Sequence, residues 1–314
     1  MSAPNDTLHG DDIDRRGFLK CMAWAGTGVV WTLAGGVLSS CTLPQAAKGA
    51  SSQADFSFVQ ISDSHIGFSN VPNMDVTGTF QQAIARVSSL PTRPAFVLHT
   101  GDLSHLSKPD QYDTVNQVLA GAKFDQVFYV PGEHDTFVDN GQAFLDRFGS
   151  GTAGNGWRSF DYGGVHFIGL VNVWNLKAGG FGVLGGDQLD WLKKDLDPLA
   201  ASTPIVVYAH VPLWAVYPSW GWGTTDAEQA LTLLQRFGSV TVLNGHIHQV
   251  LQKVEGNVTF HTAASTAFPQ PAPGAGPAPG PLRVVPEQLL SSLGVREVLF
   301  SQRAGAPVIV DAQL

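Results

Sequence analysis

The fold of this chain is constrained most by a series of short β-like runs, most of them followed closely by histidine or carboxylate residues. Apolar, β-rich runs alternate with segments of helical periodicity, which predicts an α/β fold. The runs cover residues 56–61, 95–99, 126–130, 165–171, 205–208 and 240–243, and the helical segments cover 79–90, 109–119, 186–196 and 225–237. Because α/β proteins bind ligands at the carboxyl ends of their strands, the residues that follow the runs are the candidates for a functional site.

Polar motifs of the metal-binding type follow five of these runs. They are Asp63-Ser64-His65, Gly101-Asp102, Gly132-Glu133-His134-Asp135, the single His210 and Gly245-His246-Ile247-His248. Each motif alone is common, but five in order at strand ends are not independent accidents. Mixed carboxylate and imidazole donors without a thiolate suit borderline divalent metals such as Mn, Fe, Co or Zn. The sequence therefore predicts a metal centre.

The same motifs resemble those of the calcineurin-like metallophosphoesterases, and the nearest branch is that of the class III cyclic nucleotide phosphodiesterases. The resemblance spans residues 55 to about 262, and Gly-His-x-His after a β-run is its most specific part. It implies a four-layer α/β/β/α sandwich, with residues 55–314 as the metallophosphoesterase domain. It also implies two divalent or mixed-valence metal ions of the Mn, Fe, Zn or Co class at the strand ends.

The resemblance further implies a role for each residue of the motifs. The first metal takes Asp63, His65 and His248, the second takes Glu133, His210 and His246, and Asp102 bridges the two. A metal pair of this kind can hold a bridging hydroxide that attacks phosphorus in line. His134, free of the metals, is the expected general acid that protonates the leaving oxygen. Asp135 is expected to orient His134 by a hydrogen bond, and its alternative role is that of a loop cap.

Glu133 departs from the family pattern, which has asparagine at this position. Two divalent ions supply about +4 and the three carboxylates supply about −3, so the centre is left near +1 instead of about +2. The centre is therefore expected to favour a phosphodiester monoanion over a phosphomonoester dianion, or to hold a trivalent or otherwise hard second metal, or to act weakly on phosphates. The alternatives to a phosphodiesterase are a non-catalytic metal-binding lipoprotein and a purple-acid-like phosphomonoesterase.

His105 is a second departure, three residues after Asp102. The family often has aspartate at this offset, and the related purple acid phosphatases have a metal-binding tyrosine. An imidazole here is an extra ligand, a partner that supports the Asp102 loop, or a hydrogen-bonded loop histidine. By contrast, His99, His166 and His261 lie inside β-runs and are expected to be structural.

Two loops with unusual composition flank the motifs. Residues 211–223 hold three Trp and one Tyr directly after His210, and they either form a wall over the substrate or pack against the sandwich. Residues 269–281 are rich in Pro and Gly, which predicts an extended, semi-rigid loop within the domain. The tail that follows, residues 282–314, is too short to fold separately and is expected to complete the sandwich.

The first 41 residues predict an export signal. The segment Asp14-Arg15-Arg16-Gly17-Phe18-Leu19-Lys20 precedes a moderately apolar stretch over residues 21–38, which resembles a twin-arginine signal peptide. Glycines and threonines make that stretch a poor membrane span, which is the alternative. Leu38-Ser39-Ser40-Cys41 resembles a lipobox with Cys41 as the lipid attachment site, against ordinary cleavage near Ser39. Residues 42–54 form a linker.

Composition sets the remaining expectations. Hydrophobic residues make up 44% of the 314 residues, which excludes wholesale disorder, and two cysteines exclude a disulfide framework. A formal net charge of −8 without a Lys/Arg run argues against nucleic acid as a partner. The expected partners are a small-molecule phosphate ester and the twin-arginine export machinery, with membrane contact only through a lipid anchor. The expected location is periplasmic, or tethered to a membrane outside the cytoplasm.

Overall fold

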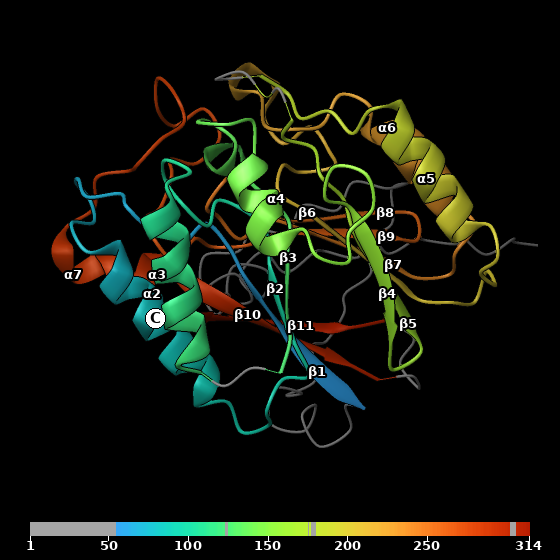
Figure 1. Ribbon diagram of the computed structural model, residues 1–314, viewed down its shortest axis with the longest axis horizontal. Coiled ribbons are helices and arrows are strands. Elements are labelled where there is room, and N and C mark those ends of the chain that lie inside the picture. Colours follow the sequence, from blue (N-terminus) through green and yellow to red (C-terminus); the bar gives the residue numbers. More distant parts are fainter. Residues whose placement is uncertain (1–54, 123–124, 175, 177–179, 302–305) are drawn as a thin grey trace, which may run out of the picture.

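Two β-sheets stacked face to face form the centre of the protein, and helices cover their outer faces (Figure 1). The computed structural model describes residues 55–122, 125–174, 176, 180–301 and 306–314. This arrangement confirms the predicted four-layer α/β/β/α sandwich. The predicted signal peptide with Cys41, and the linker over 42–54, lie outside the described residues.

The first sheet has five strands in the order β11-β10-β1-β2-β3. They are β1 (Phe56–Ile61), β2 (Val97–His99), β3 (Val127–Tyr129), β10 (Gly294–Phe300) and β11 (Val308–Gln313). The first three are parallel, with Val97 opposite both Val59 and Val127, so their carboxyl ends share one edge of the sheet. β10 pairs antiparallel to β1, which places the C-terminal tail in the same sheet as the first strand.

The second sheet has six strands in the order β4-β5-β6-β7-β9-β8. They are β4 (Arg158–Tyr162), β5 (Val165–Gly169), β6 (Ile205–Ala209), β7 (Val240–Asn244), β8 (Gln252–Glu255) and β9 (Val258–Thr262). β5, β6, β7 and β9 are parallel, so their carboxyl ends also share an edge. The sequence analysis did not predict β4 or β8, and of β9 it noted only that His261 lies in a β-run. Every residue of β8 is exposed, so this strand carries no alternating apolar pattern.

Aromatic side chains fill the space between the two sheets. Phe58 of β1 and Phe96, the residue before β2, lie 5.1 Å apart between ring centroids, and Phe167 of β5 meets both edge-on at 5.3 and 5.1 Å. All three are buried, and burial of large rings with offset or edge-on contacts is a major stabilising term in a protein core. This core fixes the distance between the strand ends of the two sheets.

Helices pack on the outer face of each sheet. α2 (Val76–Ser88), α3 (Pro109–Ala120) and the short α4 (Gln142–Phe148) supply buried residues to the cluster that covers the first sheet, and α5 (Gly186–Leu196) and α6 (Ala227–Leu234) supply them to the cluster on the second. α2 begins at Asp75, whose side chain accepts a hydrogen bond from the amide of Gly78 at 2.8 Å. α7 (Pro286–Leu289) precedes β10. Within the described part of the chain, no helix is long and apolar enough to cross a membrane.

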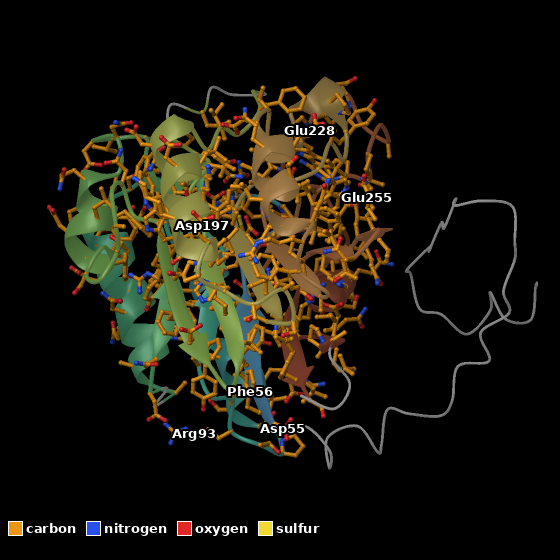
Figure 2. The ribbon with its side chains drawn as sticks, turned by 90° about the vertical axis from the view of Figure 1, so that its right-hand side faces the viewer. Asp55, Phe56, Arg93, Asp197, Glu228 and Glu255 are labelled. Carbon is orange, nitrogen blue, oxygen red and sulfur yellow. The ribbon has the colours of Figure 1, made fainter. Side chains whose placement is uncertain are left out.

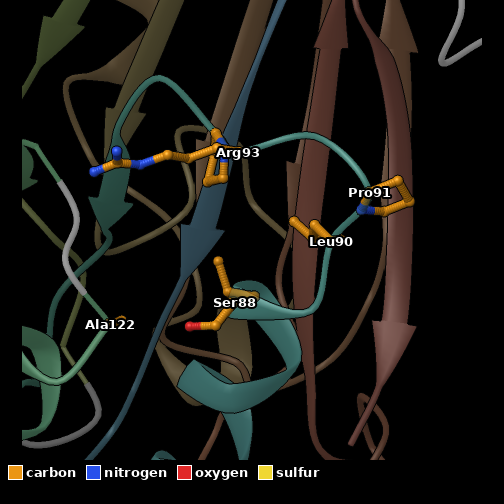
Figure 3. A pocket seen from close by; sticks show the side chains of 7 residues that line it. Ser88, Leu90, Pro91, Arg93 and Ala122 are labelled. Carbon is orange, nitrogen blue, oxygen red and sulfur yellow. The ribbon is translucent and has the colours of Figure 1, made fainter.

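The two ends of the sandwich differ in character. Figure 2 shows Asp55, Phe56 and Arg93 at one end, where β1 and the loop before β2 begin. A hollow of about 350 Å³ lies at this end, between the end of α2 and that loop (Figure 3). Arg93 is the charged residue of its lining and pairs with Asp125 at 2.8 Å. The histidine and carboxylate motifs follow the opposite ends of the strands.

His166 of β5 links the β4–β5 hairpin to α5. Its Nδ1 lies 2.7 Å from Asp161 Oδ1 and its Nε2 lies 2.9 Å from Asp195 Oδ2. Burial alone would lower the pKa of His166, but the hydrogen bonds to Asp195 and Asp161 raise it above its ordinary value. His166 is therefore structural, as predicted, and its imidazolium form is the one that the fold stabilises.

The contribution of His166 to stability should depend on pH. Because its folded-state pKa exceeds that of the unfolded chain, about 6.5, the contribution is fully present below that pH and is lost as the pH rises through the folded pKa. We expect His166→Asn to lower the free energy of unfolding more at pH 5.5 than at pH 9, measured by denaturant titration. An equal loss at both pH values would contradict this assignment.

Candidate metal centre

The five motifs meet at the edge where the parallel strands of both sheets end. Ligand atoms within 4.8 Å of one another form two main sets, Asp63, His65 and His248, and Glu133, His210 and His246. A third set, formed by Asp63, Asp102 and His210, joins them. The structure thus brings together all seven residues that the resemblance named as metal ligands. They come from loops of both sheets, so the site depends on how the sheets are stacked.

Asp102 lies between the two sets. Its Oδ2 is 3.4 Å from His65 Nε2 and 3.5 Å from His210 Nε2. Its other oxygen, Oδ1, accepts a hydrogen bond of 2.9 Å from the backbone amide of His134. Because that bond fixes the carboxylate, one oxygen remains directed at both sets, as a bridging ligand requires.

Glu133 is part of the second set despite its departure from the family pattern. Its Oε2 lies 2.9 Å from His210 Nε2, and its Oε1 lies 3.0 Å from His246 Nδ1. Burial alone would raise the pKa of Glu133, but His246 and His210 hold it well below its ordinary value. Glu133 is therefore an anionic member of the cluster.

The inward nitrogens of the histidines present lone pairs to one another and to carboxylate oxygens. His210 Nδ1 donates to the carbonyl of Thr100 at 2.7 Å, and His248 Nδ1 donates to the carbonyl of Phe268 at 2.6 Å. In the neutral form of either ring, the lone pair is therefore on Nε2. His210 Nε2 is buried and faces Glu133 Oε2 at 2.9 Å without a well-aligned hydrogen bond.

Such an arrangement is repulsive unless protons or cations lie between the donors. Burial alone would lower the pKa of His210, but Asp102 and Glu133 raise it well above its ordinary value, which shows that negative charge dominates the cluster. Inward imidazole and carboxylate donors whose outer nitrogens are held by carbonyls match the ligand chemistry of divalent metals. The residues present therefore fit a pair of metal ions.

The backbone of the ligands is strained. Among the described residues, seven other than glycine have positive φ, and five of these are candidate ligands. The five are Asp63 (φ 54°), His65 (42°), Asp102 (52°), His246 (70°) and His248 (53°). This left-handed region is disfavoured for residues with a Cβ and is typical of functional sites whose geometry the surrounding structure imposes.

Glycines stand where the backbone passes close to the ligands. A Cβ on Gly132 would lie 2.0 Å from Asp102 Oδ1, and a Cβ on Gly245 would lie 2.1 Å from Ser62 Oγ and 2.7 Å from Asp63 Oδ2. Gly132 has φ −99°, which any residue adopts, so it is needed for space and not for its conformation. The glycine of each motif is thus part of the geometry that holds the ligands.

His134 projects from a short 3-10 turn, Glu133–Asp135, after β3. Its Nδ1 donates to the carbonyl of His105 at 2.9 Å, which leaves Nε2 as the reactive atom. Its ring packs edge-on against that of His65, with centroids 4.7 Å apart. Burial alone would lower the pKa of His134, but Asp102 and Glu133 raise it.

Asp135 does not orient His134 by a hydrogen bond, and that prediction was wrong. Its buried carboxylate accepts from the backbone amides of Gly132, Leu103 and Ser104 at 2.9–3.0 Å and from the Ser104 hydroxyl at 2.8 Å. The alternative role of loop cap is the one observed. It ties the Gly132 loop to the loop after Asp102.

His105 lies beside both His65 and His134. Its Nδ1 is 3.3 Å from His65 Nδ1, and its ring is stacked on that of His134 with centroids 4.6 Å apart and an interplanar angle of 20°. Burial, helped by His134, lowers the pKa of His105 to about 4, so the ring is neutral. These contacts place His105 beside a predicted metal ligand and beside the predicted general acid.

The aromatic residues of the 211–223 loop pack against the protein. Trp220 and Trp222 are buried in a cluster with Ile247, the residue between the two histidines of the Gly-His-x-His motif. Trp214 lies 5.2 Å from Phe260 between ring centroids. The packing alternative therefore holds for these three tryptophans, and two of them support the metal-binding loop.

Phe268 and Gln270 were missed by the sequence analysis. The ring of Phe268 lies 4.8 Å from that of His65 and 4.7 Å from that of His248. Gln270 Nε2 donates to the carbonyl of His246 at 2.9 Å. Their only signal in the sequence is their position at the start of the Pro/Gly-rich loop, which the structure places beside the candidate centre.

The comparisons with known proteins agree with this geometry. Residues 56–250 match the calcineurin-like phosphoesterase family, and the chain belongs to that family. It is therefore a metallophosphoesterase, a phosphoric ester hydrolase. Because the family uses a dinuclear metal centre, the prediction of two metal ions as cofactors is confirmed at the level of the family.

Two curated relatives are phosphodiesterases. A 3',5'-cyclic-nucleotide phosphodiesterase of Nostoc sp. is 26% identical over 218 residues, which cover 68% of this chain and 79% of that protein. A probable glycerophosphodiester phosphodiesterase of Arcobacter nitrofigilis is 24% identical over 66% of this chain and 77% of its own length. A dimetal phosphatase from Danio rerio shares the fold with a TM-score of 0.61 at 13% identity, covering 79% of this chain and 94% of that one.

Gly132→Ala should disable the centre without unfolding the protein. The added Cβ would displace the Asp102 carboxylate, and a shift of about 1 Å in such a ligand costs about 100-fold in activity. We expect reduced metal content by elemental analysis and an unchanged circular dichroism spectrum. Gly186→Ala, at a position with no atom within 4 Å of the added Cβ, is the control. Full metal content in Gly132→Ala would refute the close-approach argument.

Proposed function

We propose that this protein is an exported, dinuclear metal-dependent phosphodiesterase that hydrolyses a small-molecule phosphate ester. The observation that carries the proposal is the arrangement of two similar ligand sets around one shared carboxylate, Asp102. Paired sites of this kind clamp both oxygens of an in-line displacement at phosphorus. The relatives that act on phosphodiesters support the substrate class.

The side chains divide the work between holding the ions and moving a proton. When bound, the two ions supply Lewis-acid activation and a nucleophile at neutral pH. Asp63, His65 and His248 would hold one ion and Glu133, His210 and His246 the other. His134 acts as the general acid from Nε2, because its Nδ1 is engaged by the His105 carbonyl. Its backbone amide, bound to Asp102 Oδ1, fixes its position relative to the ligands.

The negative charge of Glu133 favours a phosphodiester over a phosphomonoester as the substrate. A unit charge about 4 Å away at an effective dielectric constant near 20 interacts by about 4 kcal/mol. The glutamate lowers the positive charge that faces the substrate, and a monoester dianion depends on that charge more than a diester monoanion does. The same charge would be expected to strengthen the hold on the second ion.

Removing the charge of Glu133 should change substrate preference. The metal-loaded domain is expected to hydrolyse bis-p-nitrophenyl phosphate faster than p-nitrophenyl phosphate, and Glu133→Asn and Glu133→Gln should shift the ratio of kcat/KM toward the monoester by about 10–100-fold. Because Gln keeps the length of the Glu side chain but not its charge, the Gln variant distinguishes an effect of charge from an effect of side-chain length. An unchanged ratio in both variants would refute the charge argument, and chelation should abolish turnover in all three proteins.

Two other functions give different results in the same assay. A purple-acid-like phosphomonoesterase, suggested by an imidazole where those enzymes have a ligand tyrosine, would prefer the monoester in its wild-type form. A non-catalytic metal-binding lipoprotein would retain two ions and hydrolyse neither ester. Elemental analysis together with the two chromogenic esters therefore distinguishes the three.

Export by the twin-arginine route, with Cys41 as a lipid attachment site, is proposed from residues 1–41 alone. A route that carries folded proteins suits an enzyme that acquires its ions before translocation. Replacing Arg15 and Arg16 by lysine should leave the precursor inside the cell, as judged by fractionation and immunoblotting. Cys41→Ala should release the exported protein from the membrane fraction. Normal export of the double-lysine variant would exclude the twin-arginine route.

A further inference from the structure

The outer nitrogen of His65 has a different kind of partner from those of His210 and His248. His210 and His248 donate from Nδ1 to backbone carbonyls, which is the usual way in which a ligand ring is held. His65 Nδ1 instead faces a second imidazole, that of His105, at 3.3 Å. A backbone carbonyl is present whatever the sequence, but this partner depends on one side chain.

The direction of this hydrogen bond follows from the ligand geometry. His65 Nε2 lies 3.2 Å from His248 Nε2 and 3.4 Å from Asp102 Oδ2, so its lone pair is directed at the metal position. The proton of the neutral His65 ring is then on Nδ1. His105 Nδ1 must accept it, which places the proton of His105 on its own Nε2. The two tautomers are thereby fixed by each other.

The other contacts of His105 are to His134. Its ring stacks on the His134 ring at 4.6 Å and 20°, and its carbonyl accepts the Nδ1 hydrogen of His134 at 2.9 Å. The carbonyl selects the tautomer of His134, and the stacked ring prevents rotation about the bond to its Cβ. One residue therefore contacts a metal ligand through its nitrogen and the general acid through its ring.

The backbone at His105 is firmly held. Its amide donates to the carbonyl of Ile66 at 2.9 Å, and the two residues before it are bound by the carboxylate of Asp135. Phe68 packs edge-on against the imidazole with centroids 5.2 Å apart. Because the backbone is held in this way, the His105 side chain can fix the positions of the rings that it contacts.

We propose that His105 is a positioning residue that holds both His65 of the first metal site and the general acid His134. The proposal rests on the proposed phosphoesterase function for its second half, whereas its first half concerns metal binding alone. The two halves use different parts of the ring. The acceptor nitrogen serves His65, and the flat face serves His134.

Two substitutions separate these parts. His105→Asn keeps an acceptor at the position of Nδ1 but removes the stacked ring, whereas His105→Phe keeps a ring but removes the acceptor. His105→Ala removes both. The backbone carbonyl of residue 105 remains in every variant, so the tautomer of His134 is preserved throughout.

The first readout is metal affinity, measured by competition with a chelator. His105→Phe and His105→Ala should bind one of the two ions about 10-fold more weakly, within the range seen when the partner of a ligand histidine is lost. His105→Asn should bind both ions as the wild type does. Wild-type affinity in the Phe variant would overturn the first half of the proposal. So would a third ion per chain that is lost in all the variants, because His105 would then be a ligand.

The second readout is the dependence of kcat on the leaving group at saturating metal, with His134→Ala as the reference. His105→Asn should resemble that reference, with a loss that grows as the leaving group becomes poorer, whereas His105→Phe should keep the wild-type dependence. If His105→Asn keeps the wild-type dependence, the second half of the proposal fails. If the wild type binds two ions but hydrolyses no ester, the proposed function fails while the metal-affinity result still decides the first half.

Discussion

The structure depends on the enforced proximity of carboxylates and imidazoles at one end of the sandwich. Asp63, Asp102 and His210 are almost fully buried, and His210 Nε2 lies 3.9 Å from Asp63 Oδ1 and 3.5 Å from Asp102 Oδ2. Buried carboxylates are stable only when they are paired, and the inward nitrogens whose neutral tautomers are fixed by carbonyls pair with them only through an added proton or a cation. Cations resolve this conflict, so the fold and the ions are coupled: the sandwich imposes the arrangement, and the metals make it favourable.

The sandwich imposes that arrangement through both backbone and packing. Positive φ angles at five ligands would not persist in an isolated loop, because each disfavours the folded form by about 1 kcal/mol or more. The loops are held from behind by contacts of ordinary kinds. Asp135 ties two of them together, Trp220 and Trp222 support a third through Ile247, and Phe268 lies against the rings of His65 and His248. The geometry of the candidate ligands therefore relies on residues that are not themselves ligands.

The ligand residues could be predicted because parallel strands bring their carboxyl ends together. A short apolar run followed by Asp-x-His or Gly-His-x-His is readable in a sequence, and the sheet topology does the rest. The role of Asp135 could not be read in this way, since its partners Leu103 and Ser104 are about thirty residues distant in the chain. β8 was missed because all its residues are exposed, and α4 because seven residues give too little periodicity. The role of Phe268 could not be predicted, because its contacts with the rings of His65 and His248 are not part of any sequence motif.

The two departures from the family pattern act on opposite sides of the centre. With Glu133, each ligand set has one carboxylate and two imidazoles of its own, in addition to the shared Asp102. With asparagine, the second set would have no charge of its own, so glutamate makes the two sites alike in donor type and formal charge. A further difference lies outside the ligands: His65 of the first set is held by a side chain, whereas His248 of the same set and His210 of the second are held by backbone carbonyls. Substitution of His105 can therefore alter the geometry of the first site without replacing a ligand. Because the same side chain is stacked on His134, a change at that site also reaches the residue that moves the proton.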